Sequence, residues 1–212
     1  MVLHSQNEDL QAVITAVVSN HEHGGVRQRA ERLGIRFIHF PPPWDAERYA
    51  RIVERVGADW AALSGWLKRV FGLNPARTFN IHPALLSQFD GRFGGEGMYG
   101  HHVHEAVAEA HARGEITESG VTMHFVTDEY DRGPAFFEFR VPLRRGMTAD
   151  EIAKAVNTAE HHMQPLITDL VVNKKIGLDG RDPKTLFVSA DYGYPPLRML
   201  QGMQPPKISH LA

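Results

Sequence analysis

The chain has 212 residues, of which 42% are hydrophobic and 23% are charged, and these proportions are ordinary for a globular protein. A chain of this length fits one domain with a substantial core, because such a domain buries roughly 70% of its unfolded-state surface. Its 23 Lys and Arg residues against 25 Asp and Glu residues give a net charge of -2, so no basic surface for nucleic acid is expected.

The residues and segments that the sequence lacks exclude further classes of protein. The sequence has no cysteine, which excludes disulfides, thiolate catalysis and cysteine-based metal sites. No segment approaches the roughly 18 consecutive apolar residues of a membrane-spanning helix. Residues 1–9 lack the basic start and the apolar stretch of a signal peptide. The sequence therefore predicts a cytoplasmic protein that binds neither membrane nor nucleic acid.

The first half of the chain alternates predicted strands with predicted helices. Residues 12–20 form a β-branched run typical of a strand buried on both faces of a parallel sheet. Apolar residues at helical spacing predict a helix over 25–33, and Asp45 is expected to cap a second helix that extends to Val56. This succession predicts an α/β fold with a doubly wound, mostly parallel sheet. Further strands are expected at 35–40, 59–63 and 78–81.

The second half predicts an antiparallel part of the same sheet. Segment 91–100 is too rich in glycine for regular structure, and we expect a mobile active-site loop there, followed by a helix. Strands at 120–126 and 135–141 are expected to pair on either side of an acidic cluster. The capping-box pattern at 148–151 predicts a helix that runs toward Met163.

The domain organisation is expected to be simple. We expect one catalytic domain over residues 1–190 and no internal repeat. Residues 191–212 contain four prolines, which indicates a tail that wraps the surface or stays loose.

Two polar groups of residues indicate an active site. Asn80 and His82 lie two residues apart at the end of a predicted strand, so both side chains project from one face of the sheet. Pro83 ends the strand there, and open α/β sheets bind ligands at the carboxyl ends of strands. An Asn-x-His pair alone is weak evidence, but the downstream cluster Asp-Glu-Tyr-Asp-Arg-Gly-Pro over 128–134 adds a carboxylate. Together they predict an enzyme.

Five motifs in matching order and spacing resemble the phosphoribosylglycinamide formyltransferases, which are folate-dependent enzymes of purine synthesis. The resemblance covers roughly residues 12–180 and implies a Rossmann-like formyltransferase fold. It also implies transfer of the formyl group of 10-formyltetrahydrofolate to the amine of glycinamide ribonucleotide, with no metal. The motifs are Asn80–Leu86, Gly97–Gly100 with Val103–Val107, Gly120–Val126, Asp131–Pro134, and Glu160-His161 with Pro165.

The same resemblance implies roles for individual residues. Asn80, His82 and Asp131 match the catalytic positions. Asn80 and a protonated His82 would donate to the charge that develops on the formyl oxygen. Asp131 would raise the pKa of His82 and relay the amine proton through water. Asn157 and Glu160 match positions that contact the ribonucleotide. The folate would lie against Leu67, Lys68, Arg69 and Val70, against Asn80, and against Thr127, Asp128, Glu129 and Tyr130.

Alternative functions share the same three catalytic residues. Formyltetrahydrofolate hydrolase and the formyltransferases acting on methionyl-tRNA or amino sugars carry them too, but Gly97–Gly100 and Glu160-His161 favour the purine enzyme. A folate-binding protein without turnover is the alternative from another class. The histidines at 101–104 lack the acidic companions of a metal site, and His124 is expected to be a hydrogen-bonded structural group near the site. A monomer or a homodimer is expected.

The N-terminal region departs from the family pattern. Met1 corresponds to the middle of the family's first helix, so the first strand and the glycine-rich phosphate loop are absent from the sequence as given. Either the given start is internal to a longer protein, which we favour because the catalytic residues need a bound substrate, or the chain is short. A short chain would expose unpaired backbone and lose phosphate affinity. Ser87 stands where the family usually has proline, which is expected to loosen the turn.

Overall fold

The computed structural model describes residues 1–7, 10–179 and 185–193, so most of the expected tail over 191–212 lies outside the described residues. None of the helices in these ranges is long and apolar enough to cross a membrane. In chain order the elements are α1 (Val2–Gln6), β1 (Val17–Ser19), α2 (Gly25–Arg32), β2 (Phe37–His39), α3 (Ala46–Val56), β3 (Ala61–Ser64), η1 (Pro75–Arg77), β4 (Thr78–His82), η2 (Gln88–Gly91), α4 (His101–Ala112), β5 (Glu118–Phe125), β6 (Ala135–Pro142), α5 (Ala149–Val172), β7 (Ile176–Leu178) and β8 (Leu186–Val188).

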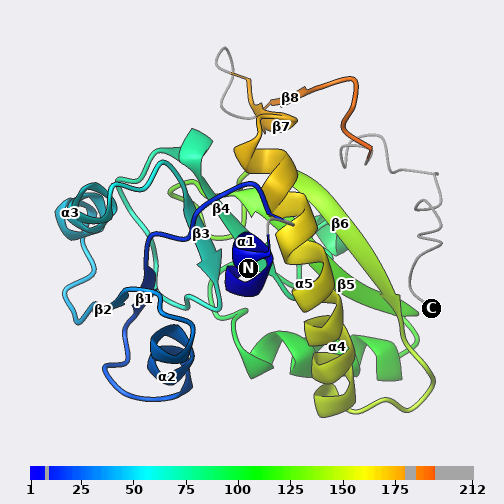
Figure 1. Cartoon of the computed structure of the whole chain (residues 1–212). Coiled ribbons are helices and arrows are strands. Elements are labelled where there is room, and N and C mark those ends of the chain that lie inside the picture. Colours follow the sequence, from blue (N-terminus) through cyan, green and yellow to red (C-terminus); the bar gives the residue numbers. More distant parts are fainter. Residues whose placement is uncertain (8–9, 180–184, 194–212) are drawn as a thin grey trace.

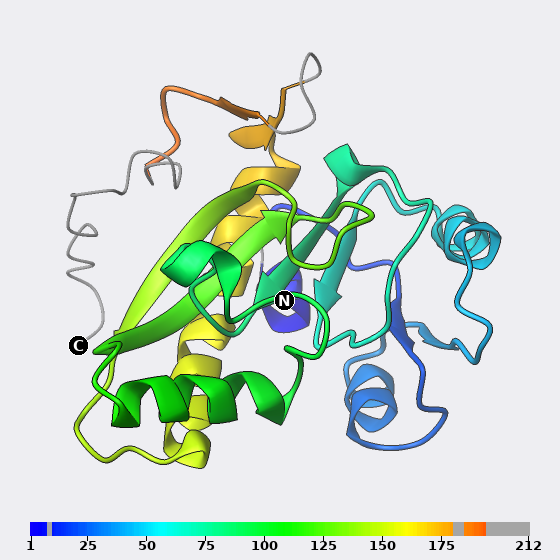
Figure 2. The same cartoon turned by 180° about the vertical axis from the view of Figure 1, so that it is seen from behind.

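The central sheet has four strands in the order β3-β4-β5-β6. Strands β3 and β4 are parallel, whereas β4-β5 and β5-β6 are antiparallel. Helix α5 crosses one face of this sheet (Figure 1), and the segment containing η2 lies over the opposite face, as the view from behind shows (Figure 2). The predicted α/β fold, with parallel strands first and antiparallel strands last, is confirmed.

Strand β1 differs from the prediction in length and in burial. It covers only 17–19 and pairs in parallel with β2, and the two form a separate two-stranded sheet. Val13, expected inside a buried strand, is 84% exposed. The prediction of a strand over 12–20 buried on both faces is therefore wrong. No described strand pairs with the second edge of β1 or of β3, so 12–16 have no neighbouring strand to hold them in a ladder.

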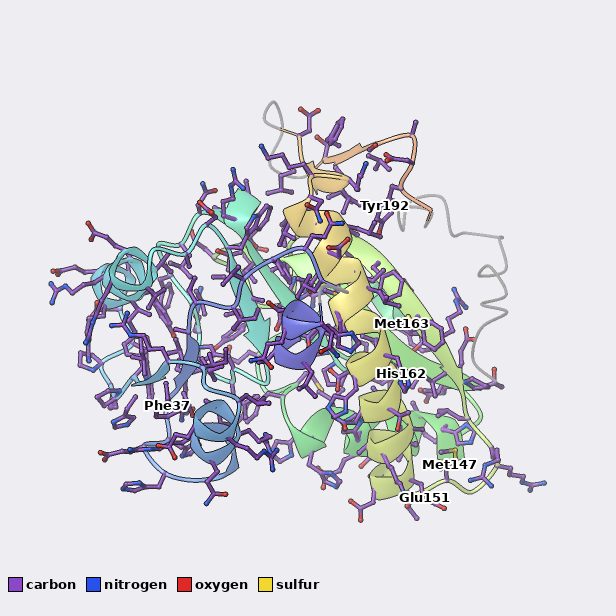
Figure 3. The ribbon with its side chains drawn as sticks, in the orientation of Figure 1. Phe37, Met147, Glu151, His162, Met163 and Tyr192 are labelled. Carbon is purple, nitrogen blue, oxygen red and sulfur yellow. The ribbon has the colours of Figure 1, made fainter. Side chains whose placement is uncertain are left out.

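Helix α5 begins as predicted but ends later. Thr148 and Glu151 form the capping box, in which each side chain accepts a backbone N–H from the other residue. The helix continues past Met163 and through Pro165, although a proline removes one intrahelical hydrogen bond. Burial of the following turns, with Val171 at 0% exposure, offsets that loss. Figure 3 labels Glu151 near the start of this helix and Met163 further along it.

The main core lies between α4, α5 and strands β4 to β6. In β4 the side chains alternate, so Phe79 and Ile81 enter this core while Asn80 and His82 face the other side of the sheet. Strand β5 is buried along seven of its eight residues. The polar side chains at the end of β4 are therefore carried by a strand that packs into the main core.

Candidate active site

A pocket of about 1300 Å³ opens beside the carboxyl ends of β3 and β4. Five stretches that are far apart in the sequence meet in its wall, together with Trp44: 63–71, 80–83, 95–104, 124–131 and 153–164. Within the described ranges, no group of three or more His, Cys, Asp or Glu side chains is placed to hold a metal ion. The wall contains every residue that the sequence indicated as a site residue: Leu67, Lys68, Arg69, Val70, Asn80, His82, Thr127, Asp128, Glu129, Tyr130, Asp131, Asn157 and Glu160.

Two histidines, an amide and a carboxylate form a contiguous cluster in this pocket. Oδ2 of Asp131 lies 3.6 Å from Nδ1 of His82, and Oδ1 of Asp131 lies 3.5 Å from Nδ2 of Asn80. His124 pairs with Asn80 across β4 and β5, and its Nε2 lies 3.2 Å from Asn80 Nδ2 and 3.3 Å from Asp131 Oδ1. The backbone N–H of Gly95 donates to Asp131 Oδ2 at 2.9 Å. His124 thus contacts two of the three predicted catalytic residues.

The loop between β5 and β6 places Asp131 in the cluster. Asp131 has a left-handed backbone conformation with φ 50°, which aspartate adopts more readily than most residues. Gly133 then approaches β5 so closely that a Cβ there would stand 1.8 Å from the carbonyl oxygen of Phe125. The loop therefore requires glycine at this position, and its close return directs the carboxylate toward the end of β4.

The protonation of His82 follows from its surroundings. Nε2–H donates to the carbonyl oxygen of Phe93 at 2.6 Å, which leaves Nδ1 toward Asp131. Burial lowers the pKa of His82 below its ordinary value of 6.5, and this effect outweighs the upward influences of Asp131 and of the Phe93 carbonyl. Asp131 acts in the predicted direction, but the prediction of a protonated His82 is corrected for the free protein. Burial therefore favours the neutral ring in the free protein.

Asp131 keeps its negative charge in spite of its burial. Burial raises the pKa of Asp131, but the hydrogen bond from His124, the neighbouring His82 and the backbone N–H of Gly95 together lower the pKa to about 2. The carboxylate is therefore ionised at neutral pH, directly beside a neutral imidazole. This pair is arranged to accept a proton on His82 and to stabilise the imidazolium that results.

Helix α5 forms the opposite wall of the pocket. Asn157 and Glu160 lie three residues apart, so their side chains share one face of the helix. Burial raises the pKa of Glu160 to about 7, although a hydrogen bond with Asn157 acts in the opposite direction. Glu160 is therefore not an ordinary solvated surface residue, and its charge changes near neutral pH.

Three further residues that line the pocket, His104, Trp44 and Gln164, were given no site role from the sequence. Burial lowers the pKa of His104 to about 4, and its buried Nδ1 has no hydrogen-bond partner. The Lys68 ammonium lies 4.8 Å from the ring centre of Trp44, and the Gln164 side chain accepts a hydrogen bond from Ser64. His104 lies within the Val103–Val107 motif, but the sequence indicated no site role for it, and none of the motifs contains Trp44 or Gln164.

Comparison with known proteins gives the family. Residues 1–168 match the family model described as Formyl transferase. The chain belongs to the formyl transferase family. The chloroplastic phosphoribosylglycinamide formyltransferase of Arabidopsis thaliana is 33% identical over 174 residues, which cover 77% of this chain and 57% of that protein. The phosphoribosylglycinamide formyltransferase of Escherichia coli K12 is 30% identical over 192 residues, which cover 79% of this chain and 83% of that protein.

A solved structure of the formyl transferase family agrees with the fold. The crystal structure of glycinamide ribonucleotide transformylase 1 from Symbiobacterium toebii superimposes with a TM-score of 0.74 at 24% sequence identity. The match covers 89% of this chain and 86% of the other. At this identity the likeness supports the fold alone. The chain also spans little more than half of the Arabidopsis protein.

Proposed function

We propose that this formyl transferase transfers the formyl group of 10-formyltetrahydrofolate to the amine of glycinamide ribonucleotide in purine synthesis. The observation that carries the proposal is the meeting of Asn80, His82 and Asp131 in one pocket that is also lined by Asn157 and Glu160. Two relatives at 30% identity or more carry the name phosphoribosylglycinamide formyltransferase, which supports the same assignment.

The reaction uses each member of the cluster. The substrate amine attacks the formyl carbon, and the amide of Asn80 donates to the oxygen on which negative charge develops. Neutral His82 accepts the amine proton at Nδ1, and the imidazolium forms 3.6 Å from the Asp131 carboxylate. The bond between the formyl carbon and N10 of the folate then breaks, and the proton passes to N10. The chain needs no metal for these steps.

The two substrates occupy opposite walls of the pocket. The folate lies against 67–70 and the backbone of 127–130, where the 47% exposed side chain of Leu67 supplies apolar contact. The ribonucleotide lies against α5, where ionised Glu160 accepts hydrogen bonds from hydroxyl groups and Asn157 supplies an amide.

A folate-binding protein without turnover is the competing function from another class, and it would bind the folate without transferring its formyl group. A formyltetrahydrofolate hydrolase, with water in place of the amine, would leave the polar wall of Asn157 and Glu160 without a use. Both alternatives predict no formylated ribonucleotide.

Product analysis separates the three functions. We would incubate the protein with carbon-13-labelled 10-formyltetrahydrofolate, with and without glycinamide ribonucleotide, and follow the label by NMR. The proposed function predicts a formamide signal that depends on the ribonucleotide and disappears in His82→Ala. Labelled formate at the same rate in both samples would identify a hydrolase, and an unchanged label with measurable folate binding would identify a binding protein.

A further inference from the structure

A row of three polar side chains runs across the sheet from the reaction site. His82 on β4 is paired with Thr122 on β5, and Thr122 is paired with Glu138 on β6. Paired residues on neighbouring antiparallel strands project to the same face, so the three side chains share the face that η2 and its flanking segment cover (Figure 2). All three are buried, with Glu138 at 9% exposure.

This row holds the backbone of the segment that follows His82. The Thr122 hydroxyl accepts the N–H of Leu86 at 3.0 Å, and its single proton faces two acceptors, the Ala84 carbonyl oxygen at 2.7 Å and Glu138 Oε1 at 3.1 Å. Glu138 accepts the backbone N–H of Ser87 at 2.9 Å and the Ser87 hydroxyl at 2.7 Å. The turn after β4 is therefore fixed at Ala84, Leu86 and Ser87 by side chains from β5 and β6.

Ser87 corrects an expectation from the sequence. Serine lacks the ring of proline, but the turn is not loosened, because the N–H and the hydroxyl of Ser87 both bind the Glu138 carboxylate. A proline could supply neither bond. Burial raises the pKa of Glu138, while the hydrogen bonds from Ser87 and Thr122 and the charge of Arg140 lower it. A carboxyl group buried at this depth is costly unless such donors satisfy it.

The far end of the same segment reaches the catalytic cluster. The carbonyl of Phe93 accepts the Nε2 proton of His82, and the N–H of Gly95 binds the Asp131 carboxylate. The segment therefore starts at His82, is fixed to Thr122 and Glu138, and returns to contact both His82 and Asp131. A substitution of Glu138 would therefore displace this backbone and, with it, the groups that hold His82 and Asp131.

We propose that Glu138 is a positioning residue for the reaction: together with Ser87 and Thr122 it fixes segment 84–95, and the segment in turn fixes the His82 ring against Asp131. The proposal rests on the catalytic role given to His82 under the proposed function. Glu138 is not among the residues that line the pocket, so it is not placed to contact a substrate there. Substitution of Glu138 is therefore expected to lower kcat and to loosen the hydrogen bond of the His82 ring to Phe93, with little change in KM.

The test compares two substitutions at one position. Glu138→Ala removes both acceptors, and kcat is expected to fall by up to roughly 100-fold, the cost of a displacement of about 1 Å at a catalytic group. Glu138→Gln keeps an acceptor for the Ser87 N–H and a polar atom for its hydroxyl, so most of the wild-type kcat is expected. Val171→Ala, a buried change on α5 distant from this row, controls for loss of stability alone.

A second readout does not depend on turnover. The Nε2 proton of His82, held by Phe93, should give a slowly exchanging proton NMR signal in the wild type and in Glu138→Gln, and should lose it in Glu138→Ala. If Glu138→Ala does not fold, Thr122→Val with Thr122→Ser as its hydroxyl-retaining control makes the same comparison. Absence of formyl transfer in the wild type contradicts the proposed function, and the NMR comparison then still decides the positioning role. Wild-type kcat or an unchanged His82 signal in Glu138→Ala would overturn it.

Discussion

The two ends of the sheet differ in how completely they are built. Strand β5 is paired on both edges, with β4 and with β6, and its residues Val121, Met123 and Phe125 are 0% exposed. Around β1 the pairing is limited to three residues, and Val13 is 84% exposed. The cluster of Asn80, His82 and Asp131 belongs to the first region. Asn80 and His82 therefore stand on a well-packed strand and Asp131 joins them from the loop after β5, whereas residues 12–16 belong to no described strand and include the exposed Val13.

The largest effect is expected from the reaction site itself. His82→Ala removes the group that accepts the amine proton, and kcat should fall by roughly 100- to 10,000-fold, the range of general acid–base catalysis. The KM for folate should change little, because the folate wall is unaltered. Steady-state kinetics with thermal unfolding as a control for folding checks this, and a near-normal rate in a folded variant would falsify the mechanism.

The next prediction measures the difference between the two regions directly. Met123→Ala should lower the free energy of unfolding by about 2–5 kcal/mol, because it leaves a cavity in a packed core. Val13→Ala should change it by less than about 0.5 kcal/mol, because an exposed side chain has few contacts to lose. Urea denaturation of both variants gives these values. Equal losses would show that the region before β1 is packed as tightly as β5.

A smaller effect is expected on the α5 wall. Because the pKa of Glu160 is about 7, the KM for the ribonucleotide should rise as the pH falls through 7, by about tenfold for the loss of one charged hydrogen bond. Glu160→Gln should have a KM that is high and independent of pH. The raised pKa also means that ionisation of Glu160 lowers stability as the pH rises from 4.5 through 7.

That linkage gives an independent check on the same residue. Glu160→Gln should unfold at a higher temperature than the wild type at pH 8, where only the wild type carries the buried charge, and the gap should narrow at pH 5. A gap of the same size at both pH values would show that burial does not govern this carboxyl group.

Local patterns in the sequence predicted local structure well. The side chain of Asp45 accepts the N–H of Arg48 at the start of α3, and the capping box starts α5 where the motif placed it. Each of these depends on residues only a few positions apart. The alternation that places Asn80 and His82 on one face of β4 is local in the same sense, and the resemblance supplied Asp131 as their partner.

Features that depend on distant partners could not be predicted in this way. The burial of 12–20 was predicted from β-branched residues alone, yet exposure depends on which strands lie beside them. The protonation of His82 depends on the balance between burial and Asp131, and the sequence shows only the second. The role of Ser87 depends on Glu138, 51 residues away.

The measurement that tests the central claim most directly is the pH dependence of single-turnover formyl transfer by the wild type and by Asp131→Asn. The wild-type rate should fall as the pH drops through the pKa of His82, which lies below 6.5. Asparagine removes the charge that raises this pKa, so the acid limb should move to lower pH while the plateau rate falls. An acid limb that stays in place or moves to higher pH would contradict a neutral His82 that accepts the proton beside Asp131.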